Sequence, residues 1–129
     1  MSQSIATIAL VVADYDEAIS FYVGKLGFAL LSDLAMGGGK RWVTVAPAGG
    51  AAKLLLARAD GAAQSAHVGN QTGGRVGFFL ETDDFARDHA AFVERGVKFL
   101  ETPRHEAYGS VAVFEDLYGN KWDLLQPKG

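Results

Sequence analysis

The feature that most constrains the fold of this chain is a unit that occurs twice along it. In the first copy, the apolar run Ile5–Val12 has the β-branched composition of a strand buried on both faces. Asp14 follows as a helix N-cap, and the helical pattern after it ends at Gly24 and Gly27. The spacing therefore predicts a buried strand, a capped helix and a glycine turn, which together extend to Phe28.

The second copy of this unit begins with the apolar run Val76–Leu80. A shift of 70 residues places Asp14 on Asp84 and repeats the apolar positions of the helix, and a shift of 69 places Gly27 on Gly96. The shared order of strand, cap, helix face and glycine favours an internal duplication over two unrelated amphipathic helices.

The segments that follow each helix have the lengths and compositions of strands. In the first half these segments are Phe28–Leu34, Arg41–Ala46 and Lys53–Arg58. The last of them has the composition of either a strand or a helix, and its short length and flanking glycines favour a strand. In the second half they are Val97–Leu100, Ser110–Glu115 and Lys121–Gln126, with a polar loop predicted over Arg104–Tyr108. Each half thus has the order βαβββ.

We therefore predict an α+β fold in which two βαβββ modules form a curved mixed sheet around a cleft, with the helices on the outside. The chain is predicted to be a single domain, residues 1–129, with one module over 1–59 and the other over 75–129. The segment 60–74 is polar, rich in glycine and without periodicity, so we expect it to be the linker between the modules.

Composition and charge exclude several classes of function. The net charge of -3 and the pI of about 5.5 leave no basic surface for nucleic acid. There is no apolar stretch of membrane-spanning length, and the N-terminus lacks the pattern of a cleavable signal peptide. The absence of cysteine excludes disulfides, thiolate metal ligands and a cysteine nucleophile. We expect a soluble cytoplasmic protein that binds neither nucleic acid nor membranes.

Two motifs stand out in the duplicated halves. The first is D-x-D-x-A-x-x-F-Y-x-x-x-L-G-F at Asp14–Phe28, and the second is D-x-x-G-N-x-W-D-L at Asp116–Leu124. With the duplicated layout, they resemble the vicinal oxygen chelate superfamily, which includes glyoxalase I, bleomycin-resistance proteins and extradiol dioxygenases. The resemblance implies a sheet cupped around a small ligand, often with a divalent metal at its centre, and pairing of the chain as a homodimer.

In that family the metal is held by His, Gln or Glu on the first and fourth strands of each half. The matching positions in this chain carry Thr7, either Lys53 or Leu55, Gly77, and Asp123. A neutral hydroxyl, an ammonium or alkyl side chain and a glycine are poor ligands for a transition metal, and Asp123 is one methylene shorter than the expected glutamate. Because a stable site needs several protein donors, the resemblance leads us to predict no metal and no other cofactor.

Asp123 is the candidate catalytic residue. It alternates with Trp122 and Leu124, which are expected to face the helices, so its carboxylate is expected to face the cleft. There it can act as a general base, bind a cationic or hydroxyl-bearing ligand, or serve as a hydrogen-bonded structural residue. Lys53, if it faces the same cleft, can pair with Asp123 or anchor an anionic substrate.

The candidates for ligand binding are Thr7, Trp42, Lys53, Tyr108 and His105. An Arg41 guanidinium beside the Trp42 ring suits an anionic aromatic ligand, although a core Trp with a surface Arg is the alternative. The Tyr108 phenol could point into the cleft or cover the sheet edge.

Histidines offer proton transfer near neutral pH. His105 stands beside Glu106 in the predicted loop, which in the family that the chain resembles lies near the cleft mouth. A polar surface loop is the alternative interpretation. His67 is interpreted as a solvated linker residue and His89 as a core residue of the second helix.

Two functions from different classes are compatible with the sequence. The first is a binding protein, similar to the bleomycin-resistance group, that holds a small anionic or aromatic ligand without the family's metal. The second is a metal-dependent lyase or dioxygenase of the glyoxalase I or extradiol dioxygenase type, with a site rebuilt from Asp123 and His67, His105 or Glu106. An isomerase or lyase that uses Asp123 as a base without a metal lies between them.

Overall fold

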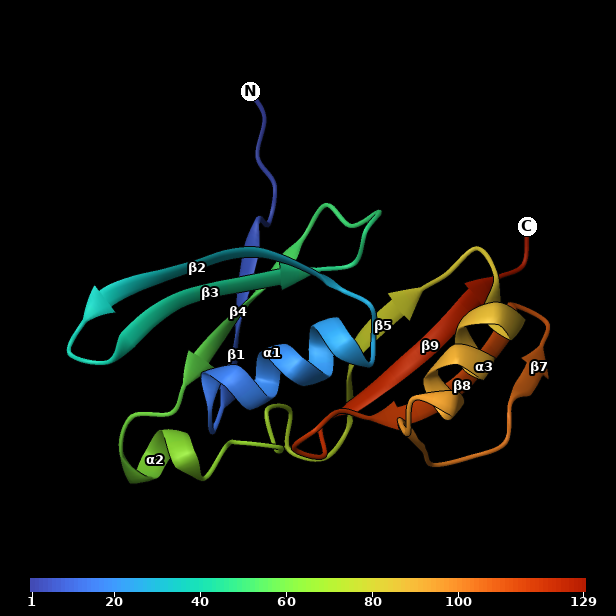
Figure 1. Cartoon of the computed structure of the whole chain (residues 1–129). Coiled ribbons are helices and arrows are strands. Elements are labelled where there is room, and N and C mark those ends of the chain that lie inside the picture. Colours follow the sequence, from blue (N-terminus) through green and yellow to red (C-terminus); the bar gives the residue numbers. More distant parts are fainter. The chain divides into compact units, whose positions relative to one another are not determined.

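Each βαβββ half of the chain forms a sheet with one long helix packed on it (Figure 1). The computed structural model describes the whole chain, residues 1–129. The chain forms two compact units, Met1–Val68 and Gly69–Gly129. The boundary between the units falls inside the segment 60–74, and each unit has a hydrophobic core of its own.

The first unit contains β1 (Thr7–Val12), α1 (Tyr15–Gly24), β2 (Ala29–Gly37), β3 (Lys40–Ala46), β4 (Lys53–Arg58) and the short helix α2 (Gly61–Ser65). Its strands lie in the order β1-β4-β3-β2, with β1 parallel to β4 and the other pairs antiparallel. One face of this sheet packs against α1. The largest side chains that are fully buried there are Leu10, Val12, Tyr22, Val43, Val45 and Leu56.

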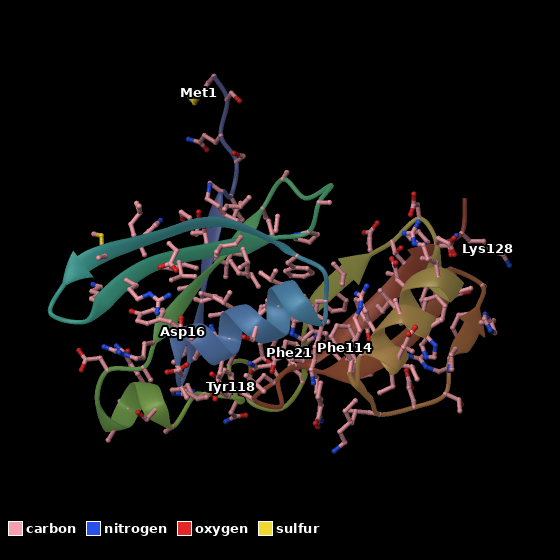
Figure 2. All side chains as sticks on the ribbon, viewed as in Figure 1. Met1, Asp16, Phe21, Phe114, Tyr118 and Lys128 are labelled. Carbon is pink, nitrogen blue, oxygen red and sulfur yellow. The ribbon has the colours of Figure 1, made fainter.

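The second unit contains β5 (Val76–Glu81), α3 (Phe85–Glu94), β6 (Lys98–Phe99), β7 (Arg104–Glu106), β8 (Gly109–Glu115) and β9 (Lys121–Pro127). Its strands lie in the order β5-β9-β8-β6, and β7 also pairs with β8. β5 is parallel to β9, and the other pairs are antiparallel. α3 packs on one face of the sheet, over a core that includes Phe92, Phe114, Trp122 and Leu124 (Figure 2 labels Phe114).

The common strand order confirms the predicted fold class. In the first sheet β1 pairs in parallel with β4, and β3 lies next to β4. In the second sheet β5 pairs in parallel with β9, and β8 lies next to β9. The predicted N-caps are also present. The Asp14 carboxylate accepts a hydrogen bond from the Glu17 N–H at 2.8 Å, and the Asp84 carboxylate accepts one from the Arg87 N–H at 3.1 Å.

Two short elements differ from the sequence prediction. The segment 60–74, predicted to have no regular structure, contains the five-residue helix α2, which has no buried residue. The predicted loop at Arg104–Tyr108 is in part the three-residue strand β7, which pairs with β8. Neither segment has the apolar periodicity that identifies an element from sequence alone. No helix of the chain is long and apolar enough to span a lipid bilayer.

The second motif, at Asp116–Leu124, builds the turn between β8 and β9. The Asp116 side chain is only 5% exposed and accepts hydrogen bonds from the Tyr118 N–H at 3.1 Å and the Asn120 N–H at 2.9 Å. It also accepts from the Asn120 amide at 3.0 Å and the Trp122 indole at 3.3 Å. This part of the motif therefore has a structural role, because one carboxylate fixes both the turn and the following core residue.

Candidate functional site

In the first unit, one face of the sheet is turned away from α1, and we call it the first open face. Side chains alternate along a strand, so residues between the buried Leu10 and Val12 point to this face. The strand registers extend the assignment across the sheet. The first open face carries Thr7, Ala9, Val11, Ser32, Leu34, Trp42, Thr44, Lys53, Leu55 and Ala57.

The first open face is mostly apolar, and its largest side chains are uncovered. Trp42 and Leu34 are cross-strand neighbours, and their exposed fractions are 40% and 57%. Thr7 and Lys53 are partners in the parallel ladder between β1 and β4, so they lie side by side at one end of the face. The structure thus places three predicted ligand-binding residues, Thr7, Trp42 and Lys53, on one surface.

Arg41 lies on the opposite face of the same sheet from Trp42. Its guanidinium pairs with Asp33 at 2.7 Å and with Asp16 at 2.9 Å, and it lies 5.1 Å from the centre of the Tyr15 ring. The hydrogen bonds from Arg41 hold the pKa of the Asp33 carboxyl below its usual value. Arg41 therefore does not supply the cation that the sequence placed beside the Trp42 ring, because neighbouring strand residues point to opposite faces.

The second unit has an open face of its own, turned away from α3. Trp122 and Leu124 are buried on the helix side of β9, as predicted, so Asp123 points to this second open face. Its strand partners are Phe79 on β5 and Val113 on β8. The Phe79 ring is 57% exposed, and it gives this face an uncovered aromatic surface next to the Asp123 carboxylate.

The ionisation of Asp123 is shifted by its surroundings. Partial burial raises the pKa of its carboxyl, Arg104 opposes the rise, and Glu101 adds to it. A carboxyl with a raised pKa favours the folded state when it is protonated. This contribution to stability is present at low pH and is lost as the pH rises through the pKa of the folded state.

Arg104 points to the same open face as Asp123, from the other side of β8. Its Nε donates to the two oxygens of Glu101 at 3.0 and 3.2 Å, and its Nη1 lies 3.3 Å from Glu106 and 3.4 Å from the Tyr108 hydroxyl. Tyr108, a predicted ligand-binding residue, is 55% exposed and joins the second open face through Arg104.

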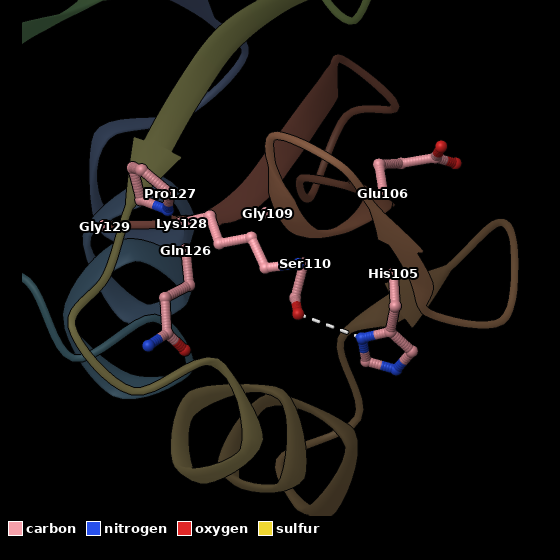
Figure 3. A pocket seen from close by; sticks show the side chains of 8 residues that line it. All are labelled: His105, Glu106, Gly109, Ser110, Gln126, Pro127, Lys128 and Gly129. Carbon is pink, nitrogen blue, oxygen red and sulfur yellow. Dashed lines mark hydrogen bonds between the residues drawn. The ribbon is translucent and has the colours of Figure 1, made fainter.

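His105 lies on the other side of the sheet from Arg104 and Asp123, because it alternates with Arg104 along β7. Its Nδ1 shares a hydrogen bond of 2.9 Å with the Ser110 hydroxyl (Figure 3). The pair lines a groove of about 420 Å³ with Glu106, Gly109, Gln126, Pro127, Lys128 and Gly129. The structure therefore does not bring His105 to the carboxylate of Asp123.

The other two histidines have different surroundings. The His89 ring lies between Phe85 and Phe99, with ring centres 5.5 and 4.3 Å away, as expected for a residue that packs on the core. His67 is exposed in the segment that follows α2.

The four positions where the family that the chain resembles holds its metal do not provide a fitting set of donors. The metal-ligand position on the fourth strand corresponds to either Lys53 or Leu55, and both side chains point to the first open face. Neither of them offers an oxygen or imidazole ligand. A side chain at Gly77 would overlap the methyl group of Thr72. No group of three or more His, Asp and Glu side chains in the chain is arranged to hold a metal ion. The side chains at these positions therefore do not fit the metal of that family.

Three residues of the second open face were not singled out from the sequence: Phe79, Glu101 and Arg104. Phe79 follows another phenylalanine in the apolar run of β5, so nothing in the sequence indicates which ring is uncovered. Arg104 falls in a segment predicted as a loop, and only the pairing of β7 with β8 determines which face of the sheet its side chain points to.

The two modules share one topology, to which the second adds the short strand β7, and each has one helix-covered and one open face. This arrangement defines a class of protein with a duplicated βαβββ fold. Residues 4–124 match the model of the Glyoxalase/Bleomycin resistance protein/Dioxygenase superfamily, and the chain belongs to this family.

Similar proteins cover nearly the whole chain. An uncharacterised protein of Shewanella frigidimarina is 57% identical, over 98% of this chain and 95% of its own length. The crystal structure of UcmS2 is 26% identical and matches with a TM-score of 0.83, over 97% of this chain and 98% of that one. TnmS3, an antibiotic binding protein from Streptomyces sp. CB03234, is 33% identical and matches with a TM-score of 0.79, over 98% of both chains.

Proposed function

We propose that this chain is a small-molecule binding protein that holds an aromatic or anionic organic ligand against its open faces without a metal ion. The observation that carries the proposal is the Trp42 side chain, 40% exposed on a mostly apolar strand surface. A flat aromatic ligand would cover Trp42 and Leu34 and remove their apolar surface from water. Lys53, which forms no ion pair, supplies a cation at one end of the same face.

The relatives support a binding role of this kind. TnmS3, which is 33% identical to this chain, is an antibiotic binding protein. We propose that this chain acts in the same way on a small organic molecule, in the cytoplasm, where the sequence leads us to expect it. Its Thr7 hydroxyl, next to Lys53, would then serve as a hydrogen-bonding group for the ligand.

Trp42→Ala is expected to weaken binding of both 2-naphthoate and its uncharged methyl ester by about tenfold, because both lose the same aromatic contact. Lys53→Met is expected to weaken binding of the anion and to leave binding of the ester unchanged. Calorimetric titration gives both affinities, and circular dichroism shows that the variants are folded.

The matched control is Leu117→Ala, which removes an exposed apolar side chain from the turn after β8. It should bind both compounds as the unmodified protein does. The proposal is contradicted if neither compound binds at millimolar concentration, or if Trp42→Ala binds them with unchanged affinity.

The alternative is a metal-dependent lyase or dioxygenase, or an isomerase that uses Asp123 as a base. It has the weaker support, since no three metal-binding side chains gather and His105 lies away from Asp123. Stoichiometric binding of Ni(II), Zn(II), Mn(II) or Fe(II) that is lost in Asp123→Ala would favour the alternative over a metal-free binding protein.

We also propose that the chain acts as a homodimer. Ile8 and Leu30, on the helix side of the first sheet, are 46% and 42% exposed, and they form apolar surface that a second copy would remove from water without covering either open face. Light scattering during size-exclusion chromatography is expected to give twice the 13.7 kDa mass of one chain. A mass of one chain at all micromolar concentrations would contradict this part of the proposal.

A further inference from the structure

The guanidinium of Arg104 is held in a fixed position on the second open face. It is bound through Nε by both oxygens of Glu101, and one of these oxygens also accepts the Val113 N–H at 3.0 Å. Glu101 is therefore tied to the backbone of β8, the central strand between β7 and β9. An arginine oriented in this way loses less conformational entropy when a ligand binds to it.

Arg104 keeps hydrogen-bonding capacity that the protein does not use. Its Nε and Nη1 have partners in Glu101, Glu106 and Tyr108, and its Nη2 has none. Asp123 is close enough for Arg104 to lower its pKa, yet the two side chains form no ion pair. Arg104 is the strand partner of Val111 and Asp123 the strand partner of Val113, so the free Nη2 donor and the carboxylate acceptor flank β8 on the same open face.

The charges around this pair indicate what kind of ligand group fits. Glu101, Glu106 and Asp123 place three carboxylates around one guanidinium. An anionic group would have to bind against this excess of negative charge, while a neutral oxygen needs only one N–H donor. A neutral hydroxyl can donate to Asp123 in the same way.

We propose that Arg104 and Asp123 are the specificity-determining residues of the second open face, which recognise the carbonyl and hydroxyl oxygens of an uncharged aromatic ligand. Arg104 donates to the carbonyl oxygen, Asp123 accepts from the hydroxyl, and the exposed Phe79 ring next to Asp123 contacts the aromatic part. This inference rests on the proposed function as a small-molecule binding protein, and it names the chemistry of the ligand.

The experiment compares probes that differ by a single polar group. 2-Acetonaphthone and 2-isopropylnaphthalene have nearly the same shape and differ in the carbonyl oxygen; 2-naphthol and 2-methylnaphthalene differ in the hydroxyl. The unmodified protein is expected to prefer each oxygen-bearing probe by about tenfold. Arg104→Met should abolish the carbonyl preference, and Asp123→Leu should abolish the hydroxyl preference.

The pH dependence of the hydroxyl preference distinguishes a role of Arg104 in ligand recognition from a purely structural role. Burial, Arg104 and Glu101 shift the pKa of Asp123, and Glu106 and Tyr108 contact Arg104. Further charged residues on the same face are Glu81, Lys98, Glu115 and Lys121. The hydroxyl preference should appear as the pH rises and Asp123 ionises. Arg104 lowers the pKa of Asp123. The pH at which the hydroxyl preference is half developed, its midpoint, should therefore move to higher pH in Arg104→Met and stay near its original value in Arg104→Lys.

The matched control is Arg87→Met, which removes another arginine held by two carboxylates, Asp83 and Asp88, at the start of α3. It should leave both preferences and the midpoint unchanged. Unchanged carbonyl preference in Arg104→Met, or unchanged hydroxyl preference in Asp123→Leu, overturns the inference while leaving the proposed function standing. Failure of all four naphthalenes to bind the unmodified protein overturns the inference, and the proposed function falls with it only if 2-naphthoate and its methyl ester also fail to bind.

Discussion

Asp116→Ala is expected to lower the free energy of unfolding by about 4 kcal/mol, a large part of the roughly 5–15 kcal/mol that stabilises a typical domain. The carboxylate accepts hydrogen bonds from the Tyr118 and Asn120 N–H groups, the Asn120 amide and the Trp122 indole. Asp116 and Asn120 are each 5% exposed, and Trp122 is 4% exposed, so water cannot readily replace the lost acceptor. Each buried donor left without a partner costs roughly 1–3 kcal/mol.

Urea unfolding followed by circular dichroism measures this loss. Asp116→Asn keeps one acceptor oxygen and the size of the side chain, and it should lose about half as much stability as Asp116→Ala. Asp83→Ala is the control for removal of a surface carboxylate, since the Asp83 side chain is 89% exposed, and it should change stability by no more than about 0.5 kcal/mol. A loss below about 1 kcal/mol in Asp116→Ala would show that the turn does not depend on this carboxylate.

Gly109→Ala is expected to cost about 3 kcal/mol, because both the backbone angle and the space at this position require glycine. Gly109 begins β8 with φ at +149°, a conformation that L-residues rarely adopt. An added Cβ would overlap the carbonyl oxygen of Gln126 on the neighbouring strand and lie 3.0 Å from the Pro127 Cα. These obstacles belong to the backbone of β9, so the strands would have to separate locally.

Gly24→Ala provides the control for the same chemical change at a permissive position. Gly24 ends α1, its φ is not positive, and no atom would lie within 4 Å of an added Cβ. Alanine favours helix over glycine by about 1 kcal/mol, so this variant should be as stable as the unmodified protein or more stable. Equal unfolding midpoints for Gly109→Ala and Gly24→Ala would refute the assigned role of Gly109.

The elements that could be predicted from the sequence are those with local signals. Asp14 and Asp84 stand before apolar helical patterns, and both were correctly identified as N-caps. The order βαβββ in each half could be predicted from the duplication, whereas the order of the strands within each sheet comes from the structure, because pairing between distant strands has no local signal. β7 was missed since Arg104–Glu106 contains no apolar residue, and it is a strand only through its pairing with β8.

The candidate site was harder to predict than the fold. The direction of Asp123 followed from its buried neighbours Trp122 and Leu124, because a strand with large apolar residues on one side has a defined facing. On β3 the two faces do not differ in this way, since Trp42 alternates with Val43 and both faces of the strand carry apolar residues. The sequence therefore did not separate Trp42 from Arg41, which the structure places on opposite sides.

The contact between Gly77 and Thr72 has a consequence for redesign. Thr72 belongs to the connection between the modules and is fixed there by a hydrogen bond of 2.7 Å from its hydroxyl to the Arg75 carbonyl. An imidazole introduced at residue 77 would take the volume of the Thr72 methyl group, so installing a metal ligand there requires Thr72 to be replaced by a smaller residue or to move. Any attempt to engineer a glyoxalase-type centre into this scaffold must begin with that residue.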